Sequence, residues 1–454
     1  MNRIRTILLI TFASCSLSGV YAQKPYTLHD CMAYAVEHST RAVVQATENS
    51  DARLARRDAI LRTFVPQVTA GTYAYSNFGR TVDPETNTYI STTSFNNSYS
   101  VSASLTLFDG LSSINKIRIS NTAVRMGISR EQQVRDELCL AVMESYFNVL
   151  FQAKMIEVLE AQLASVRTNH TLVSRQYEMG QKSYPDVAQI EADLADREYQ
   201  LLQYRNQHDD ALFSLKSLML WPVSDELLLD DSLLSSVAPA SDAQLFPSGD
   251  AALQLVDQAR QTLPAAKIAQ EQLNRARYDL QTAKLQFLPS LSLNGGWSTS
   301  FYTYPGMESH YTVPFGKQWR NNSGEYVQIS MTIPLFTHLS RFSHLSRMKN
   351  GYKRAQAQYR QTMHDVEAEV HRALHDCRGA WMARMQASKR ALAQRESFRL
   401  NERKFEQGIL SPLDYRTVSD TYLRAQAEEF NAILQYHLKN SVVNFYQGIS
   451  YLEQ

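Results

Sequence analysis

The chain has 454 residues, a formal net charge of +1 and 20% charged residues. Because nucleic-acid binding needs a strongly basic surface, this near-neutral balance excludes nucleic acid as an expected partner. Beyond Cys15 the chain has an odd number of cysteines, so we expect buried free thiols at Cys31, Cys139 and Cys377 rather than a disulfide framework.

Residues 1–22 are predicted to be an export signal peptide. Arg3 and Arg5 supply the positive charge, an apolar run follows, and residues 20–22 fit a cleavage site. Lipoprotein processing at Cys15 is the alternative, although the residues before it fit that pattern poorly. Downstream there is no apolar run of about 18 residues, so we expect no transmembrane helix in the exported chain.

Each half of the chain is predicted to contain a helix followed by a pair of strands. The strands are expected at 66–78, 98–108, 289–302 and 326–336, and the polar segments between the two members of each pair are expected to be loops. Apolar residues alternate with small polar ones, as in strands that cross an outer membrane. An antiparallel sheet with one face on a soluble core is the alternative.

The number of predicted strands favours an assembly of several chains. Four strands cannot close a barrel, because about eight is the practical minimum. An open sheet edge in lipid would also leave backbone groups without hydrogen bonds. We therefore expect several copies of the chain to pool their strands.

A long helix follows each predicted strand pair, at 111–178 and 339–406. Neither stretch contains proline, and at ~1.5 Å per residue each would be a rod on the order of 100 Å long. Each rod is expected to turn at a tip, 179–185 and 407–412, and to return as a second helix. Apolar residues at steps of three, four and seven predict coiled-coil packing, and residues 221–249 are predicted to be a linker.

The two tips share their residues at one offset. In each, a glycine can end the rod in the left-handed conformation, and a serine and an aspartate can cap the return helix. The matching pairs, each 228 residues apart, are Arg175 and Arg403, Gly180 and Gly408, Ser183 and Ser411, and Asp186 and Asp414. The chain is therefore predicted to consist of two internal repeats, 23–220 and 250–454.

Taken together, these features resemble the TolC-like outer-membrane efflux proteins, also called outer membrane factors. The resemblance rests on the export signal, the repeated order of helix, strand pair, long helix, tip and helix, F-x-P before each strand pair, and G-x-x-S-x-x-D at both tips. It implies an α+β membrane protein. Its trimeric 12-stranded outer-membrane β-barrel would be continued by a long periplasmic α-helical coiled-coil barrel.

The resemblance also implies a function and partners. A homotrimer of this kind is a passive exit duct of a tripartite efflux pump or a type I secretion system. It docks on a periplasmic adaptor (membrane fusion) protein, and through it on an inner-membrane pump, and it contacts outer-membrane lipid. The protein would lie in the bacterial outer membrane and extend into the periplasm.

Carried over residue by residue, the resemblance assigns adaptor docking to the tips. The residues are Gly180, Ser183, Asp186, Gly408, Leu410, Ser411 and Asp414. The alternative is that they only cap helices. Glu402 and Glu406, near the end of the second rod, are candidates for a pore constriction, but the arginines among them favour a solvated helix face.

No catalytic or metal site is predicted, and no cofactor is expected. His371 and His375 have a chelating i, i+4 spacing, with His364 two turns earlier, but Arg372 stands where the glutamate of H-E-x-x-H would be. Polar residues facing water account for these histidines equally well. No nucleophile or phosphate-binding motif occurs, so we expect no enzyme activity.

The alternative function is a non-transporting structural coiled-coil protein of the cell envelope, with the strands as a soluble sheet. Aromatic residues at the strand ends favour the duct, because aromatic girdles mark the rims of outer-membrane barrels. These residues are Tyr99, Phe108, Phe301, Tyr302, Tyr326 and Phe336.

Overall fold

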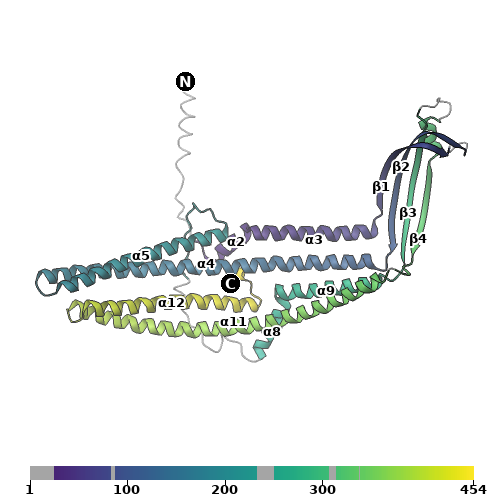
Figure 1. The fold of residues 1–454 in the computed structure, drawn as a ribbon. Coiled ribbons are helices and arrows are strands. Elements are labelled where there is room, and N and C mark those ends of the chain that lie inside the picture. Colours follow the sequence, from purple (N-terminus) through teal and green to yellow (C-terminus); the bar gives the residue numbers. More distant parts are fainter. Residues whose placement is uncertain (1–24, 83–86, 233–249, 306–312, 337) are drawn as a thin grey trace, which may run out of the picture. The chain divides into compact units, whose positions relative to one another are not determined.

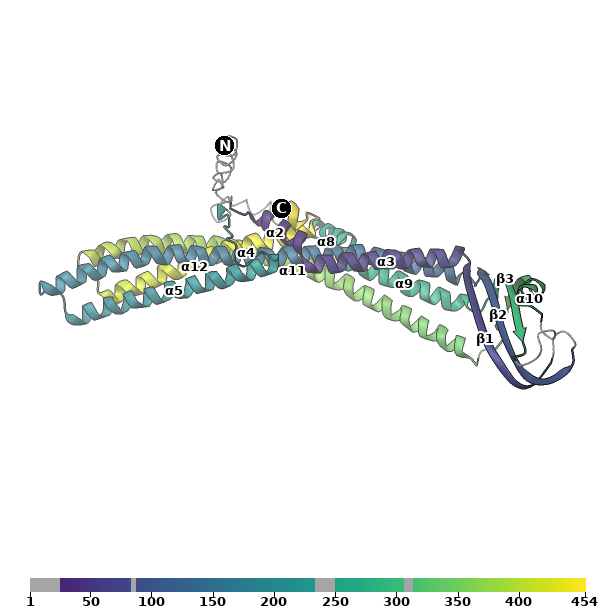
Figure 2. The ribbon, with the colours of Figure 1, turned by 90° about the horizontal axis from the view of Figure 1, so that it is seen from above.

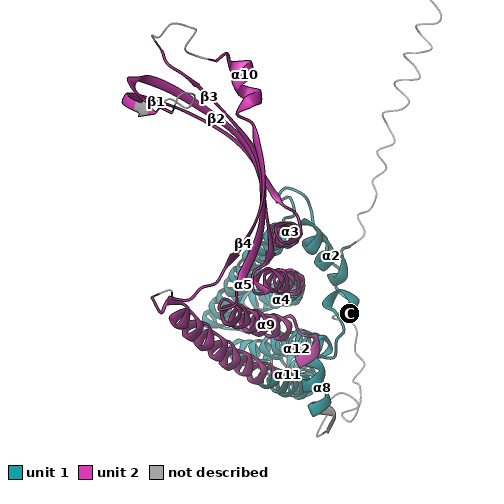
Figure 3. Ribbon diagram, turned by 90° about the vertical axis from the view of Figure 1, so that its right-hand side faces the viewer, with its two compact units in different colours: residues 1–42, 134–259, 367–454 teal, residues 43–133, 260–366 magenta. Residues whose placement is uncertain are grey.

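The computed structural model of the chain describes residues 25–82, 87–232, 250–305, 313–336 and 338–454 (Figure 1). The predicted signal peptide and residues 233–249 of the predicted linker lie outside the described residues. None of the described helices is long and apolar enough to cross a membrane. The chain forms two compact units (Figure 3). Unit 1 comprises Met1–Ala42, Val134–Ala259 and Glu367–Gln454, and unit 2 comprises Val43–Gln133 and Arg260–Val366.

Two unbroken helices of 67 residues each dominate the chain. They are α4 (Ser112–Glu178) and α11 (Ser340–Glu406), and both contribute to each unit. Neither contains proline, which would remove a hydrogen bond from the helix. The helices α5 (Tyr184–Met219) and α12 (Pro412–Tyr446) return alongside them, so unit 1 contains two helical hairpins (Figures 1 and 2).

The core of unit 1 joins these hairpins to α2 (Leu28–His38). Tyr146 of α4 is fully buried, and its hydroxyl donates to the backbone oxygen of Asp230 at 2.6 Å. A parallel bridge between Tyr26 and Leu229 adds a second link, so the segments before α2 and after α5 are held against the helices. The prediction of buried free thiols is confirmed for the three described cysteines, Cys31, Cys139 and Cys377.

Unit 2 contains an antiparallel sheet with the strand order β1-β2-β3-β4. The strands are β1 (Gln67–Val82), β2 (Tyr89–Phe108), β3 (Ser290–Thr303) and β4 (Gly324–Thr332). Within the described ranges, β1 and β4 each pair on one side only, so both sheet edges present unpaired backbone groups. The remaining described elements of the chain are α3 (Thr40–Phe64), α8 (Asp250–Thr262), α9 (Pro264–Leu285), α10 (Phe315–Asn321) and η2 (Tyr451–Glu453).

The sheet differs from the sequence prediction at its ends. β1 and β2 pair as far as Val82 and Tyr89, so most of the first predicted loop is strand. Cross-strand pairing outweighs the local turn signals there, and the guanidinium of Arg80 lies 4.5 Å from the ring centre of Tyr89. The second predicted loop contains α10. β4 ends at Thr332, short of the predicted end at 336, because Pro334 has no N–H to donate to the ladder.

One face of the sheet is mostly apolar and the other is mostly small and polar, although Tyr73 and Tyr75 of β1 lie on the polar face. Directly paired residues share a face, and Val101 lies opposite Trp297 on the apolar side. On the other side, the hydroxyls of Thr69 and Ser102 are 2.9 Å apart and share a hydrogen bond. Val327, on the apolar side, is 82% exposed. The described part of a single chain therefore leaves much of the apolar face uncovered.

Candidate functional site: the two hairpin tips

Both long helices end in the same hydrogen-bonded turn. Gly180 follows α4 and Gly408 follows α11, with φ angles of +74° and +73°. In each turn two N–H groups donate to carbonyls of the last helical turn. These bonds are Gly180 to Tyr177 at 2.9 Å, Gln181 to Gln176 at 2.8 Å, Gly408 to Phe405 at 2.9 Å and Ile409 to Lys404 at 2.9 Å. This is the Schellman arrangement, which needs the left-handed backbone that glycine adopts without penalty.

A serine and an aspartate begin each return helix. In both tips the serine hydroxyl donates to the aspartate Oδ2 at 2.7 Å, in the pairs Ser183–Asp186 and Ser411–Asp414. In the first tip the Ser183 N–H also donates to Asp186 at 3.0 Å, and these bonds lower the pKa of Asp186 below its ordinary value. In the second tip the Asp414 N–H donates to Ser411 Oγ at 3.1 Å. The caps use the same residues in different bonds.

The apolar side chains of the second tip divide into a buried set and an exposed set. Leu410, which the resemblance assigns to docking, packs against the core cluster that contains Phe405 and Tyr415. Its neighbour Ile409 is 71% exposed. Leu410 is therefore placed to support the tip, whereas Ile409 is exposed to solvent. The sequence feature that could have indicated the exposed position is the apolar Ile409 directly after the turn glycine.

The first tip also presents apolar side chains that sequence reasoning missed. Met179 precedes the turn glycine and is 64% exposed, and Tyr184 begins α5 and is 68% exposed. Leu413 of the second tip is 60% exposed. Each lies beside a capping residue, and the capping pattern of the sequence gives no information on the exposure of its neighbours. Both tips thus combine a hydrogen-bonded turn with exposed apolar side chains.

The two acidic candidates for a pore constriction have different environments. Glu402 is half-buried, and Ser165 of α4 donates to its Oε1 at 3.2 Å. The hydroxyls of Ser165 and Tyr415 are also 3.2 Å apart. Glu406 is exposed at the end of α11. Glu402 therefore links helices, and of the two only Glu406 stands in solvent.

Within the described ranges, the histidine pair of α11 has no third side chain beside it that completes a metal site. His371 and His375 are both exposed. Among the described residues, no group of three or more histidine, cysteine, aspartate or glutamate side chains could hold a metal ion.

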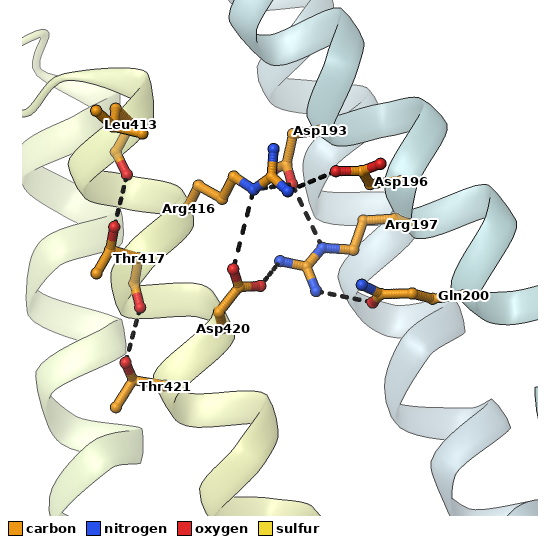
Figure 4. Close-up of polar contacts among 9 residues, drawn as sticks. All are labelled: Asp193, Asp196, Arg197, Gln200, Leu413, Arg416, Thr417, Asp420 and Thr421. Atoms are coloured by element: carbon orange, nitrogen blue, oxygen red, sulfur yellow. Dashed lines mark hydrogen bonds and ion pairs between the residues drawn. The ribbon is translucent and has the colours of Figure 1, made fainter.

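An ionic network with one buried pair, Asp193 and Arg197, connects α5 and α12 near the tips (Figure 4). Arg197 Nε lies 3.5 Å from Asp193 Oδ1, and these side chains are 1% and 2% exposed. The Arg197 guanidinium also pairs with Asp420 of α12. From α12, Arg416 lies 3.6 Å from Asp193 and 2.5 Å from Asp196. Arg416 also lies 3.9 Å from Asp420 of its own helix. Each arginine is therefore paired with carboxylates of both helices.

Burial makes Asp193 the sensitive member of this network. Neither of its carboxylate oxygens has a hydrogen bond among the described residues. Burial raises the pKa of Asp193 above its ordinary value, and the guanidinium groups of Arg197 and Arg416 oppose that rise. Removing one partner of a buried pair leaves an uncompensated charge in the interior. The contact between α5 and α12 thus depends on both arginines.

The family model described as Outer membrane efflux protein matches residues 34–219 and 255–447 of the chain. The chain belongs to the outer membrane efflux protein family. The resemblance found in the sequence is thereby confirmed, and membership places the protein in the outer membrane.

Individual members of the family are distant in sequence. Outer membrane protein TolC of Vibrio cholerae is 24% identical over 343 residues, which cover 73% of this chain and 71% of that protein. Alkaline protease secretion protein AprF of Pseudomonas aeruginosa is 26% identical over 201 residues, which cover 44% of this chain but only 38% of AprF. The crystal structure of VceC from Vibrio cholerae superposes with a TM-score of 0.74 at 14% identity, covering 94% and 96% of the two chains. That likeness shows a shared fold.

Proposed function

We propose that this efflux-family protein is a passive exit duct of a tripartite efflux pump or a type I secretion system. In this proposal three chains pool their strands in a 12-stranded outer-membrane barrel, and the helical hairpins extend into the periplasm. The tips dock on a periplasmic adaptor, which connects the duct to an inner-membrane pump. Because the pump supplies the energy for transport, the duct needs no enzyme activity of its own.

The observation that carries the proposal is the open, one-sidedly apolar sheet. Within the described residues, β1 and β4 keep free edges, while apolar side chains such as Ile329 are 66% exposed. In lipid, free edges are tolerated only if they pair with another chain, because no water is available to the backbone. Joining β4 of one protomer to β1 of the next satisfies both edges and turns the apolar face outward.

The likeness of the two halves supports a ring of similar helical hairpins. The family model matches one segment in each half, and α4 and α11 have equal lengths of 67 residues. Both hairpins also end in the same turn. Three chains with two such hairpins each would present six similar tips at one end of the tunnel.

Uncovered apolar side chains on otherwise polar tips support a docking role. Exposed apolar surface in a setting of polar residues typically marks an interaction site. The exposed side chains are Met179, Tyr184, Ile409 and Leu413. A helix cap by itself requires none of them, so capping alone does not account for the tips.

The assembly is tested by native mass spectrometry of the detergent-extracted protein. We expect a trimer, because a single chain cannot satisfy its sheet edges in lipid. A stable monomer in detergent that keeps its full strand content would contradict the shared barrel.

Docking is tested by a double variant, Gly180→Val and Gly408→Val. Nothing lies within 4 Å of a Cβ at either position, so the cost is backbone strain at positive φ, about 1–2 kcal/mol each. The variant should export and trimerise, yet lose transport and photo-cross-linking of residue 409 to the adaptor.

The matched control is Gly351→Val with Gly379→Val. These helical glycines of α11 also have open space around a Cβ, but they lack positive φ. The control should transport normally. Wild-type transport by the tip variant would show that the tips are helix caps only.

A further inference from the structure

The short helix α10 is fastened to β3 by buried side chains. Gln318 is 2% exposed, and its Nε2 donates to the backbone oxygens of Tyr302 at 2.8 Å and Val313 at 2.7 Å. The Tyr302 N–H donates to Gln318 Oε1 at 3.0 Å. Thr299 Oγ1 donates to the backbone oxygen of Trp319 at 2.9 Å. The helix is therefore held in unit 2 beside the C-terminal end of β3 (Figure 3).

These hydrogen bonds replace a missing strand. β4 begins at Gly324, opposite Ser298, so the last residues of β3 have no partner on β4. Gln318 satisfies both backbone groups of Tyr302 there, and Asn322 Nδ2 donates to the oxygen of Ser300 at 2.7 Å. In water such an edge needs no cover. In a membrane it does, because solvent cannot bond the free groups.

Aromatic rings join α10 to the apolar face of the sheet. Trp319 lies with its ring centre 4.9 Å from that of Tyr99 and 5.5 Å from that of Trp297. Phe315 lies 5.2 Å from Phe301. Trp297 shares its face with the exposed apolar residues of β4. The helix thus ends the apolar band with the residues that prefer the boundary between lipid and water.

The outward side of α10 is cationic. At about 100° per residue, Lys317 and Arg320 lie opposite Phe315 and Trp319 on the helix. Lys317 and Arg320 are exposed, and Phe315 is 46% exposed. No ion pair of the described residues involves either cation. A helix with an aromatic side toward the sheet and a cationic side beyond it fits a negatively charged lipid surface.

We propose that α10 is a lipid-binding element that lies in the outer-leaflet headgroup layer and holds anionic lipid headgroups with Lys317 and Arg320. The proposal rests on the proposed barrel, because only in that arrangement does the apolar face meet lipid. Phe315 and Trp319 then lie at the boundary of the acyl chains. The depth of the barrel in the membrane is set at this end by α10.

Depth is tested by a spin label at Gly316→Cys, read as its collision rates with oxygen and with a water-soluble nickel complex in phosphatidylcholine vesicles. A Cβ at Gly316 meets nothing within 4 Å, so the label is tolerated, and the described native cysteines are buried. Ile329→Cys is the lipid reference and Gly379→Cys the water reference. We expect residue 316 to fall between them, at headgroup depth.

The references separate the two proposals. If residue 316 is as water-accessible as residue 379 while residue 329 is in lipid, α10 is not interfacial and the barrel stands. If residue 329 is itself in water, the barrel fails and the inference fails with it.

Headgroup binding is tested with spin-labelled phosphatidylglycerol in phosphatidylcholine vesicles. The wild type should hold the anionic lipid in preference to the zwitterionic one. Lys317→Gln with Arg320→Gln should lower that preference about fivefold per charge removed. Lys389→Gln with Arg395→Gln, which removes the same charge from exposed positions of α11, should leave it unchanged. An equal loss in both variants would overturn the proposal, and so would complete competition by inorganic phosphate.

Discussion

Replacing Arg197 by methionine isolates the energetics of the network between α5 and α12. The substitution keeps much of the side-chain volume but removes the charge that lies 3.5 Å from Asp193. Asp193, 2% exposed, then retains only Arg416, at 3.6 Å. Breaking a buried pair costs about 3–5 kcal/mol of stability. Because Arg416 still compensates part of the Asp193 charge, we expect a loss at the lower end of this range, ~3 kcal/mol. That corresponds to roughly 100-fold faster local opening of α5.

A second substitution should restore most of that loss. In the double variant Asp193→Asn with Arg197→Met, residue 193 is neutral, so no buried charge is left without its partner. A buried pair can often be replaced as a unit with little loss of stability. Arg416 keeps its 2.5 Å contact with Asp196. We expect the double variant to lie within ~1 kcal/mol of the wild type.

Hydrogen exchange measured by mass spectrometry on α5 peptides of the assembled protein reads these differences directly. The matched control is Arg205→Met, the same substitution on the same helix, at an exposed pair with Glu160 whose side chains are 55% and 50% exposed. That pair should be worth at most ~1 kcal/mol. Equal effects of Arg197→Met and Arg205→Met, or a double variant as labile as the single one, would refute the argument.

Three further outcomes are expected. Because burial raises the pKa of Asp193, the folded state binds that proton more tightly than the unfolded state does. The protonated carboxyl therefore contributes its full stability below the unfolded pKa of about 3.9, and this contribution is lost as the pH rises through the raised pKa. The stability that Arg197→Met loses relative to the wild type, measured as faster hydrogen exchange, should therefore shrink on acidification. Ile329→Arg should impair trimer assembly by about 2–4 kcal/mol near the bilayer midplane, whereas Ser330→Arg, on the polar face, should be tolerated, and equal losses on native gels would contradict the face assignment. Gly408→Ala should speed exchange of the tip amides by about 5–30-fold, the equivalent of 1–2 kcal/mol of left-handed strain, without changing the oligomer.

Features set by neighbouring residues could be predicted from the sequence. The left-handed backbone of Gly180 and Gly408 follows from local sterics, and the serine–aspartate caps follow from three-residue spacing. The alternation of the strands likewise depends on nearest neighbours, and it predicted the apolar and polar faces.

Features set by distant contacts could not be predicted in this way. The pairing of β1 with β2 extended into a segment full of turn residues, because the partner strand supplied hydrogen bonds that local propensity does not register. Which of Ile409 and Leu410 faces inward depends on a core cluster built from four helices. Arg197 and Asp420 are 223 residues apart, and as charged residues of polar helix stretches they carried no signal of burial.

The ionic network also shows where the two halves of the chain have diverged. The offset of 228 residues that relates the capping residues relates Arg197 to Ala425 and Asp420 to Ala192. In a ring of alternating hairpins, such as the proposed trimer, the contact of α5 with α12 inside a chain would alternate with a similar contact between chains. Only the contact inside the chain then carries this pair of charges. Because breaking a buried ion pair is costly and separating alanines is not, hairpins in such a ring would part first between protomers. The charged contact would then move as a rigid unit, and the tips it supports would keep their shape while the ring widens.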